Sequence, residues 1–401
     1  MESHSYDVTV LGAGPGGYVA AIRAAQRGKR VAIVEKERLG GVCLNWGCIP
    51  TKALLRIAER REFLEEAARY GFEIGEVRVN WETVIRRSRE AAEKLANGVA
   101  FLMRKHKIRV FSGHGRFLAP NRIGVESSSG SCEIVTTNTI VATGGRPALL
   151  PGVVADGERI VTSKEAMVLP SRPARLAVIG AGAIGLELAY FFAAFGTKVT
   201  ILEYAPRALP TGDPEISTAL ERAFRRRKVD VVTSARVKSV ERRGEIAAVE
   251  YEVEGRSEKI EADVVLVATG VRGNIEDLGL ERIGVRTKGP FIAVDRDLQT
   301  SVAGVYAIGD VIGPPALAHS ASFEGLHAVH HLCGEDPSPL DPTSIPACIY
   351  CQPQVASVGL TEPEARESGR DVKIGRFPFS ANGKAIAVDE PEGFVKIIAD
   401  A

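Results

Sequence analysis

Two long stretches of the chain share one pattern of hydrophobic and polar positions. In each, a short aliphatic run is followed by a glycine-rich turn, a segment of small and apolar residues, and a second aliphatic run. Apolar runs of five or six residues bounded by glycine are typical of strands buried in a parallel sheet, and the longer segment predicts a helix packed on that sheet. The pattern therefore predicts a strand–turn–helix–strand unit at residues 6–35 and another at residues 175–203.

Both turns have the spacing Gly-x-Gly-x-x-Gly. Their glycines are Gly12, Gly14 and Gly17 in the first unit and Gly180, Gly182 and Gly185 in the second. The first glycine permits the tight turn, the second lets a pyrophosphate approach the backbone, and the third allows close helix–strand packing. Each unit ends in an acid, Glu35 or Glu203, placed to hydrogen-bond a ribose diol. The sequence thus predicts two dinucleotide-binding domains.

Later markers repeat as well. An Ala-Thr-Gly segment ends an apolar strand at residues 142–144 and again at residues 268–270. The first glycine precedes this segment by 130 residues in the first copy and by 88 in the second, so the first copy carries about 42 extra residues. These include the stretch GGVCLNWGCIPTKALL, at residues 40–55. This stretch is therefore an insertion that we expect to perform chemistry on the ligand of the first domain.

A third marker, GVYAIGDVIGPPALAHSASFEG, follows the second copy. It predicts an apolar strand ending in Gly309-Asp310 and a helix beginning near Ala318-His319. An aspartate at a strand end suits the hydroxyls of a large cofactor. Because this segment comes after the second copy, we expect the second domain to be inserted in the first.

Composition excludes several classes of protein. The 401 residues are 45% hydrophobic and 25% charged, with a net charge of +1, which gives no electrostatic basis for nucleic-acid binding. We interpret the Arg225-Arg226-Arg227 run as a solvated helix face. No apolar run reaches the ~18 residues of a membrane span, and the first residues do not resemble a signal peptide. We therefore expect a cytoplasmic location, where a close cysteine pair is more often catalytic or metal-binding than structural.

Cys43 and Cys48 form that close pair. Five residues of regular helix rise ~7.5 Å, beyond the ~7 Å Cα separation that a disulfide allows. A bridge therefore requires a break in the helix, which Gly47 could provide, while Pro50 fits the first turn of a following helix. Lys52 would share a helix face with Cys48.

Other interpretations of the cysteines remain open on the residues alone. The pair could be a structural disulfide, or it could bind a metal together with Cys348 and Cys351. Against a metal, positions three apart on the expected strand IPACIYCQP point to opposite faces, and the Cys43–Cys48 spacing is not a usual zinc spacing. We expect no metal, and we take Cys132 and Cys333 to be incidental.

These motifs together resemble the pyridine-nucleotide disulfide oxidoreductases, over essentially the whole chain. CLNWGCIPTK favours the dihydrolipoyl dehydrogenase branch of that family over the glutathione and mercuric reductases. The resemblance implies an α/β fold with two Rossmann-like domains and a partial α+β interface domain. It implies the following division: an FAD-binding domain at residues 1–145 and 271–343, an NAD-binding domain at 146–270, and the start of a dimerisation domain at 344–401.

The resemblance also implies a redox disulfide. Cys43 would exchange with a dithiol substrate, and Cys48 would lie against the flavin. Lys52 and Glu187 would form a charged pair beside the reactive flavin nitrogen, although an exposed helix acid is the alternative for Glu187. The implied reaction is oxidation of protein-bound dihydrolipoamide, with electrons passing through FAD to NAD⁺.

Further cofactor contacts are implied residue by residue. The residues matching FAD-contacting positions are Gly12, Gly14, Gly17, Glu35, Lys52, Gly115, Thr143, Gly144, Asp310, Leu317, Ala318 and His319. A packing role is the alternative for His319. The residues matching NAD-contacting positions are Gly180, Gly182, Gly185, Glu187, Glu203, Val237 and Gly270.

Glu203 also favours NAD over NADP. A 2′-phosphate ~4 Å from its carboxylate would be repelled by about 4 kcal/mol per unit charge at an effective dielectric of 20. Arg207 is the nearby basic residue that could offset this repulsion. We therefore expect NAD.

The sequence departs from the family at its C-terminal end. Members continue into a His-Pro segment whose histidine is the general base for the partner subunit, whereas this sequence ends at Ala401. Its histidines, at positions 4, 106, 114, 319, 327, 330 and 331, include none in such a context. We expect a truncated or naturally shortened chain, active with NADH and a dye but poor with dihydrolipoamide.

The implied partners are a lipoyl domain of a 2-oxo-acid dehydrogenase or glycine-cleavage complex, and a second subunit in a homodimer. The implied cellular role is redox homeostasis. Two alternatives remain: a reductase of another disulfide or a quinone, and a non-catalytic flavoprotein that only binds FAD and NAD.

Overall fold

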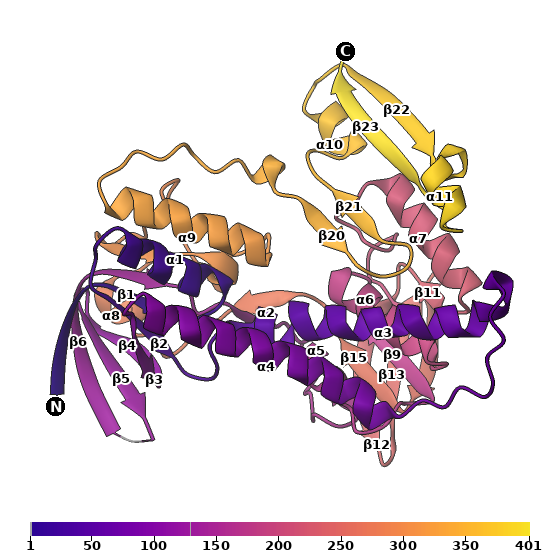
Figure 1. The fold of residues 1–401 in the computed structure, drawn as a ribbon, viewed down its shortest axis with the longest axis horizontal. Coiled ribbons are helices and arrows are strands. Elements are labelled where there is room, and N and C mark those ends of the chain that lie inside the picture. Colours follow the sequence, from indigo (N-terminus) through magenta and orange to yellow (C-terminus); the bar gives the residue numbers. More distant parts are fainter. Residues whose placement is uncertain (1, 129) are drawn as a thin grey trace. The chain divides into compact units, whose positions relative to one another are not determined.

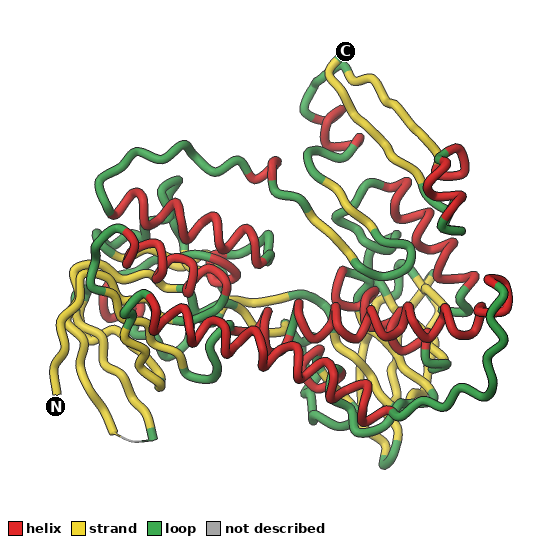
Figure 2. The backbone as a smooth tube through the Cα atoms, in the orientation of Figure 1, coloured by secondary structure: helices red, strands yellow, loops and turns green. Residues whose placement is uncertain are grey.

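The computed structural model describes residues 2–128 and 130–401, which form two compact units. Unit 1 comprises Met1–Ala53, Thr83–Ala148 and Gly270–Leu340. Unit 2 comprises Leu54–Glu82, Leu149–Thr269 and Asp341–Ala401. Figure 1 traces the chain through its helices and strands, and Figure 2 colours the same trace by secondary structure. Among the described residues, no helix is both long and apolar enough to cross a membrane.

Unit 1 is built on a seven-stranded sheet with a parallel part and an antiparallel part. The parallel strands are β3 (Arg109–Ser112), β2 (Val31–Glu35), β1 (Glu2–Leu11), β6 (Gly130–Val141) and β19 (Val305–Ala307). β4 (His114–Ala119) and β5 (Arg122–Ser127) extend β6 in antiparallel order. Val10, at the centre of β1, pairs with Ile33 on one side and Ile140 on the other, and all three are fully buried. Burial of both faces explains the unbroken aliphatic runs of these strands.

Helices α1 (Pro15–Gln26) and α9 (Ala318–Leu332) pack against each other in unit 1. Both are rich in small residues, and a Cβ atom on Gly325 would lie 2.8 Å from the carbonyl oxygen of Gly16. The two backbones therefore approach closely at these glycines. Because α9 follows β19, the chain that returns after residue 270 completes the sheet begun by β1. The short strands β7 (Gly145–Pro147) and β16 (Val271–Gly273) pair where the chain leaves and re-enters.

Unit 2 contains a second parallel sheet, followed by an antiparallel one. The parallel strands are β11 (Asp230–Val232), β10 (Lys198–Leu202), β9 (Arg175–Ile179), β15 (Val264–Val267) and β8 (Ile160–Val161). The antiparallel strands are β12 (Arg236–Arg243), β13 (Ile246–Val253) and β14 (Arg256–Ala262). Helix α6 (Ala183–Ala194) is buried along most of its length, and Trp81 stacks on its Phe191 and Phe192. The predicted α/β fold with two parallel, dinucleotide-type sheets is confirmed.

The last segment of unit 2 runs from residue 341 to residue 401. Its strands and helices are β20 (Ala347–Ile349), β21 (Val355–Ser357), α10 (Glu362–Glu367), β22 (Val372–Pro378), α11 (Gly383–Ala387) and β23 (Phe394–Asp400). The side chain of Lys396, on β23, is only 7% exposed and forms ion pairs with Asp213, Glu215 and Glu362. Asp213 caps helix α7 (Pro214–Arg226), so Lys396 ties this segment to α7.

The remaining elements are short or continue from one unit into the other. They are α2 (Gly41–Trp46), α3 (Cys48–Glu66), α4 (Trp81–Lys105), α5 (Ser163–Ala166), α8 (Leu280–Ile283), β17 (Thr287–Lys288) and β18 (Phe291–Ile292). The described residues also form the 3₁₀ turns η1 (Ala67–Tyr70), η2 (Gly309–Ile312), η3 (Pro342–Ser344) and η4 (Phe379–Ala381). The arginine run at the end of α7 is exposed, as expected, and its Arg227 also pairs with Glu62 and lies 5.2 Å from the ring centroid of Tyr190.

Candidate active site

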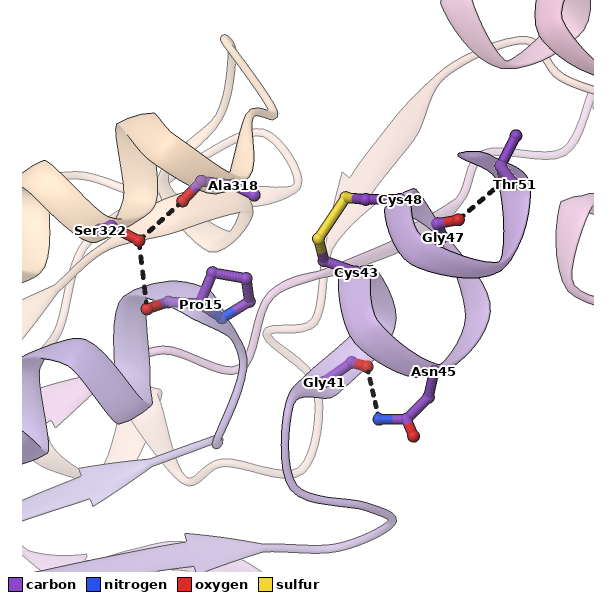
Figure 3. Close-up of a disulfide and its surroundings, with 9 residues drawn as sticks. All are labelled: Pro15, Gly41, Cys43, Asn45, Gly47, Cys48, Thr51, Ala318 and Ser322. Atoms are coloured by element: carbon purple, nitrogen blue, oxygen red, sulfur yellow. Dashed lines mark hydrogen bonds between the residues drawn. A yellow bond between two sulfur atoms is a disulfide. The ribbon is translucent and has the colours of Figure 1, made fainter. Parts of the chain in front are cut away.

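Cys43 and Cys48 are joined by a disulfide, as Figure 3 shows. Cys43 lies within α2 and Cys48 is the first residue of α3, and their Cα atoms are 4.6 Å apart. Gly47 separates the two helices with non-helical backbone angles (φ −144°, ψ −111°). The expected break in the helix is therefore present, and the pairing is confirmed. Among the described residues, no group of three or more His, Cys, Asp or Glu side chains is arranged to hold a metal ion.

Residues 40–48, which carry both cysteines, lie against the first glycine turn. Gly40 donates its N–H to the carbonyl of Ala13 at 2.8 Å. Gly41 has a left-handed backbone (φ 58°), and a Cβ atom there would lie 2.6 Å from the Cα of Gly14. Only glycine allows both this conformation and this contact. The insertion that carries the cysteines is thus in direct contact with the turn that the sequence assigns to a dinucleotide.

The segment is also held by its own side chains. The Asn45 amide donates to the carbonyls of Leu39 and Gly41, at 3.0 and 2.9 Å, and Thr51 Oγ1 donates to the carbonyl of Gly47 at 2.7 Å. These bonds, two of which are drawn in Figure 3, fix the backbone on both sides of the disulfide. The conformation around the sulfurs therefore does not depend on the disulfide alone.

The glycine turns fit dinucleotides in both units. Gly12 has a φ of 102°, and a Cβ atom there would clash with the carbonyl of Ala142. The middle glycine of each turn, unlike Gly12, has open space beside it. A Cβ atom on Gly14 would lie 4.0 Å from its nearest heavy atom, and a Cβ atom on Gly182 would have no heavy atom within 4 Å. A side chain there would occupy open space next to the helix N-terminus, where a pyrophosphate binds. The residues present therefore fit a dinucleotide cofactor in each unit.

The two terminal acids occupy equivalent positions. Glu35 accepts hydrogen bonds from the backbone N–H groups of Ala13 and Glu37, both at 2.8 Å. Glu203 accepts them from Ala181, at 2.6 Å, and from Ala205, at 2.7 Å. Burial raises the pKa of Glu35 even though these backbone bonds oppose it. Each carboxylate fixes its glycine turn and keeps lone pairs available for a ribose hydroxyl.

Asp310 lies in η2, directly after β19, in the position predicted for it. Its carboxylate is largely buried, and burial followed by the charge of Glu324 raises its pKa. Glu324, on α9, accepts hydrogen bonds from the N–H of Gly309 at 2.6 Å and from Ser320 Oγ at 2.8 Å. The sequence analysis missed Glu324. No local pattern points to this role, because the Gly309 N–H that it accepts lies 15 residues earlier.

Asn274 was also missed. Its amide donates to the carbonyl of Thr143 at 2.9 Å, and the Thr143 hydroxyl donates to the carbonyl of Asn274 at 2.8 Å. Gly144 accepts a further hydrogen bond from the N–H of Asn274. The first Ala-Thr-Gly segment is thus fixed by a residue 131 positions later in the sequence.

Glu187 is buried, with 4% of its surface exposed, so the alternative of an exposed helix acid is wrong. Its Oε1 atom accepts a hydrogen bond from the N–H of Tyr350 at 2.9 Å. Burial and the charge of Glu187 raise the pKa of the neighbouring Cys351 thiol to about 12. Lys52 belongs to unit 1 and Glu187 to unit 2, so their pairing stays a prediction.

The remaining predicted contacts lie at element ends or in strands. Leu317, Ala318 and His319 form the start of α9, where His319 is exposed. Gly115 lies in β4, and a Cβ atom there would be 2.9 Å from Leu11 Cδ2, which supplies a packing reason for glycine. Val237 lies in β12, and Gly270 follows β15 with a φ of 126°.

Comparisons with known proteins agree with this geometry. Residues 6–325 match the pyridine nucleotide-disulphide oxidoreductase family, and residues 345–401 match its dimerisation domain. The chain is 46% identical to a dihydrolipoyl dehydrogenase of Bacillus subtilis, covering 98% of this chain and 86% of the relative, and 46% identical to one of Zymomonas mobilis, covering 100% and 86%. Its fold is similar to that of LpdA from Mycobacterium tuberculosis, with a TM-score of 0.91 and 28% identity over 100% of this chain and 87% of that one.

The fold is also similar to that of RclA, an HOCl-induced flavoprotein disulfide reductase of Escherichia coli. That comparison gives a TM-score of 0.87 and 27% identity, covering 99% of this chain and 87% of RclA. The family match spans most of the sequence, and the disulfide and both glycine turns lie within it. The chain therefore belongs to the pyridine nucleotide-disulphide oxidoreductases, flavoproteins that use FAD and NAD.

Proposed function

We propose that this protein oxidises the dithiol of protein-bound dihydrolipoamide to the disulfide and transfers the electron pair to NAD⁺. The observation that carries the proposal is the Cys43–Cys48 disulfide, which spans a helix break and lies against the glycine turn of unit 1. The curated relatives at 41–46% identity that carry the name dihydrolipoyl dehydrogenase support the choice of substrate.

The residues that would hold FAD are the first glycine turn, Glu35, Thr143-Gly144, Asp310 and the start of α9. NAD would be held by the second glycine turn, Glu203, Val237 and Gly270. The chemistry supplied by bound FAD is two-electron transfer between the Cys48 sulfur and NAD⁺. Lys52 and Glu187 are proposed as a charged pair that acts beside the flavin.

The cysteines perform the exchange with substrate. A substrate thiolate attacks Cys43 Sγ, forms a mixed disulfide and releases Cys48 as a thiolate. The second substrate thiol then displaces Cys43 and closes the lipoamide disulfide. The substrate loses two electrons and two protons, and the enzyme disulfide gains the two electrons. Because Cys48 is the first residue of the 19-residue helix α3, the positive end of the helix dipole favours its thiolate.

The domain assignment is also a proposal: FAD at 1–145 and 271–343, NAD at 146–270, and the interface at 344–401. The parallel pairing of β19 with β6 supports the discontinuous FAD domain. Residues 54–82, which this assignment gives to the FAD domain, are part of compact unit 2. A homodimer formed through the dimerisation domain, and a lipoyl-domain partner in a 2-oxo-acid dehydrogenase or glycine-cleavage complex, complete the proposal. The unbridged cysteines Cys132, Cys333, Cys348 and Cys351 support a cytoplasmic location.

Single-turnover reduction of the FAD-loaded protein tests the proposal. One equivalent of dihydrolipoamide, added without oxygen, should open the Cys43–Cys48 disulfide and change the absorption of the bound flavin, and both Cys43→Ser and Cys48→Ser should lose this response while still oxidising NADH with a dye. Cys132→Ser is the matched control and should behave as wild type. If dihydrolipoamide does not reduce the wild-type protein, but another disulfide or a quinone oxidises its NADH-reduced form, the substrate would be that disulfide or quinone.

A further inference from the structure

Arg89 is in contact with the segment between the two cysteines. It lies on α4, and its Nη1 atom donates a hydrogen bond to the carbonyl oxygen of Asn45 at 2.7 Å. Its guanidinium lies over the ring of the next residue, Trp46, with Cζ 5.1 Å from the ring centroid. Asn45 and Trp46 stand between Cys43 and Cys48 in the sequence. Arg89 therefore holds the end of α2, where the helix breaks to allow the disulfide.

Stability alone does not explain an arginine at this position. Its Nε and Nη2 atoms are buried and have no hydrogen-bond partner among the described residues. Burial, and then the charge of Arg38, lower the pKa of Arg89, which means that the cation is held in an unfavourable environment. Buried donors without partners are costly, and an apolar side chain of similar size would stabilise the fold at least as well. The positive charge itself must therefore have a use.

We propose that Arg89 is a positioning residue for the Cys43–Cys48 pair, and that its buried charge favours the thiolate released when the disulfide opens. The inference rests on the proposed function, because it requires the disulfide to open during turnover. Once the sulfurs separate, the covalent link across the helix break is lost. The bond from Arg89 to Asn45, together with the Asn45 amide bonds, then keeps the two sulfurs together for the return reaction.

The size of the charge effect follows from chain geometry. Asn45 is two residues from Cys43 and three from Cys48, and Arg89 Nη1 lies 2.7 Å from its carbonyl oxygen, which places the guanidinium within roughly 15 Å of both sulfurs. A unit charge at that distance, in an effective dielectric of about 20, changes a thiol pKa by roughly one pH unit. The other charges of this segment, Arg38 and Lys52, are also positive and act in the same direction. Removal of Arg89 should therefore shift thiolate formation without abolishing it.

The test measures thiolate formation directly. The FAD-loaded protein is reduced with dithiothreitol without oxygen and treated with iodoacetamide over a series of pH values, and alkylation of Cys43 and Cys48 is quantified by mass spectrometry. Arg89→Gln keeps a donor for the Asn45 carbonyl but removes the charge, whereas Arg89→Lys keeps the charge. Arg87→Gln is the matched control, because Arg87 is an exposed arginine of the same helix, paired with Glu90.

We expect the alkylation midpoint to rise by about one pH unit in Arg89→Gln and to stay near the wild-type value in Arg89→Lys and Arg87→Gln. An Arg89→Gln midpoint equal to that of Arg87→Gln would overturn the inference. If Arg89→Gln does not fold, Arg89→Lys still tests the inference. An alkylation midpoint raised by a full pH unit in Arg89→Lys, which retains the charge, would contradict the role of the charge. If NADH fails to open the wild-type disulfide, the proposed function would be refuted instead. The effect of Arg89 on thiol alkylation would still hold, because that experiment opens the disulfide with dithiothreitol.

Discussion

The Oε2 atom of Glu203 accepts a hydrogen bond of 2.6 Å from the backbone N–H of Ala181, which lies in the second glycine turn. Glu203 is buried, with 8% of its surface exposed, and its other carboxylate oxygen accepts a hydrogen bond from the N–H of Ala205. A negative charge is therefore fixed at the edge of the proposed NAD site, where the 2′-phosphate of NADP would lie. Glu35 accepts the equivalent hydrogen bond from the N–H of Ala13 in unit 1, so the same carboxylate–turn hydrogen bond occurs in both units.

Glu203→Gln should weaken the preference for NADH over NADPH. The glutamine keeps one acceptor for a backbone N–H but removes the charge that repels the phosphate by roughly 4 kcal/mol. We expect the ratio of kcat/KM values for NADH and NADPH, measured with a dye as acceptor, to fall at least tenfold. Glu35→Gln is the matched control and should leave this ratio unchanged. An unaltered preference in Glu203→Gln would show that the selection lies elsewhere.

Asp310→Asn should weaken FAD binding by one order of magnitude or more. The Asp310 carboxylate is largely buried and its pKa is raised, which suits an acceptor for cofactor hydroxyls in a site that excludes water. Glu324→Gln should weaken binding less, because the amide oxygen can still accept from Gly309. The fluorescence of FAD released on dilution measures both effects. Asp336→Asn, in an exposed side chain of the same unit, should retain FAD as the wild type does.

Lys396→Met should destabilise unit 2. The substitution removes the cation shared by Asp213, Glu215 and Glu362. Its pair with Asp213 is buried, and breaking a buried ion pair costs roughly 3–5 kcal/mol. Denaturant unfolding should show this loss. Lys373→Met, on neighbouring β22, is the control and should change the free energy of unfolding by less than about 0.5 kcal/mol. Equal stability of the two variants would contradict the importance of the cluster.

The ion pairs around Lys396 also predict that the stability of the fold falls at low pH. Hydrogen bonds from Arg376 and Lys396 lower the pKa of Glu215 to about 2, from an ordinary value of 4.5. Because the folded-state pKa is below the unfolded one, the stability that Glu215 contributes is fully present above pH 4.5 and is lost as the pH falls toward 2. The Tm of the wild type should therefore fall through this range, and that of Lys396→Met should fall less. A parallel decline in both proteins would exclude Glu215 as the source.

The local motifs were predictable because their constraints are local. Gly12 and Gly47 permit a turn and a helix break that the adjacent residues require, so spacing located the glycine turn and the break between the cysteines, while the redox disulfide itself was implied by the family resemblance. Glu324, Asn274 and Arg89 were not predictable in this way. Their partners lie 15, 131 and 44 residues away, and only the folded sheet and helices bring them together. The pairing of Arg227 with Glu62, 165 residues distant, was not predictable for the same reason.

The central claim is that the Cys43–Cys48 disulfide exchanges an electron pair with NADH through bound FAD. Its most direct test is to add one equivalent of NADH to the FAD-loaded protein without oxygen and to count alkylatable thiols at residues 43 and 48. The account predicts two new thiols per chain, at these positions only, and none when FAD has been removed. Oxidation of NADH with both sulfurs still bridged would contradict it.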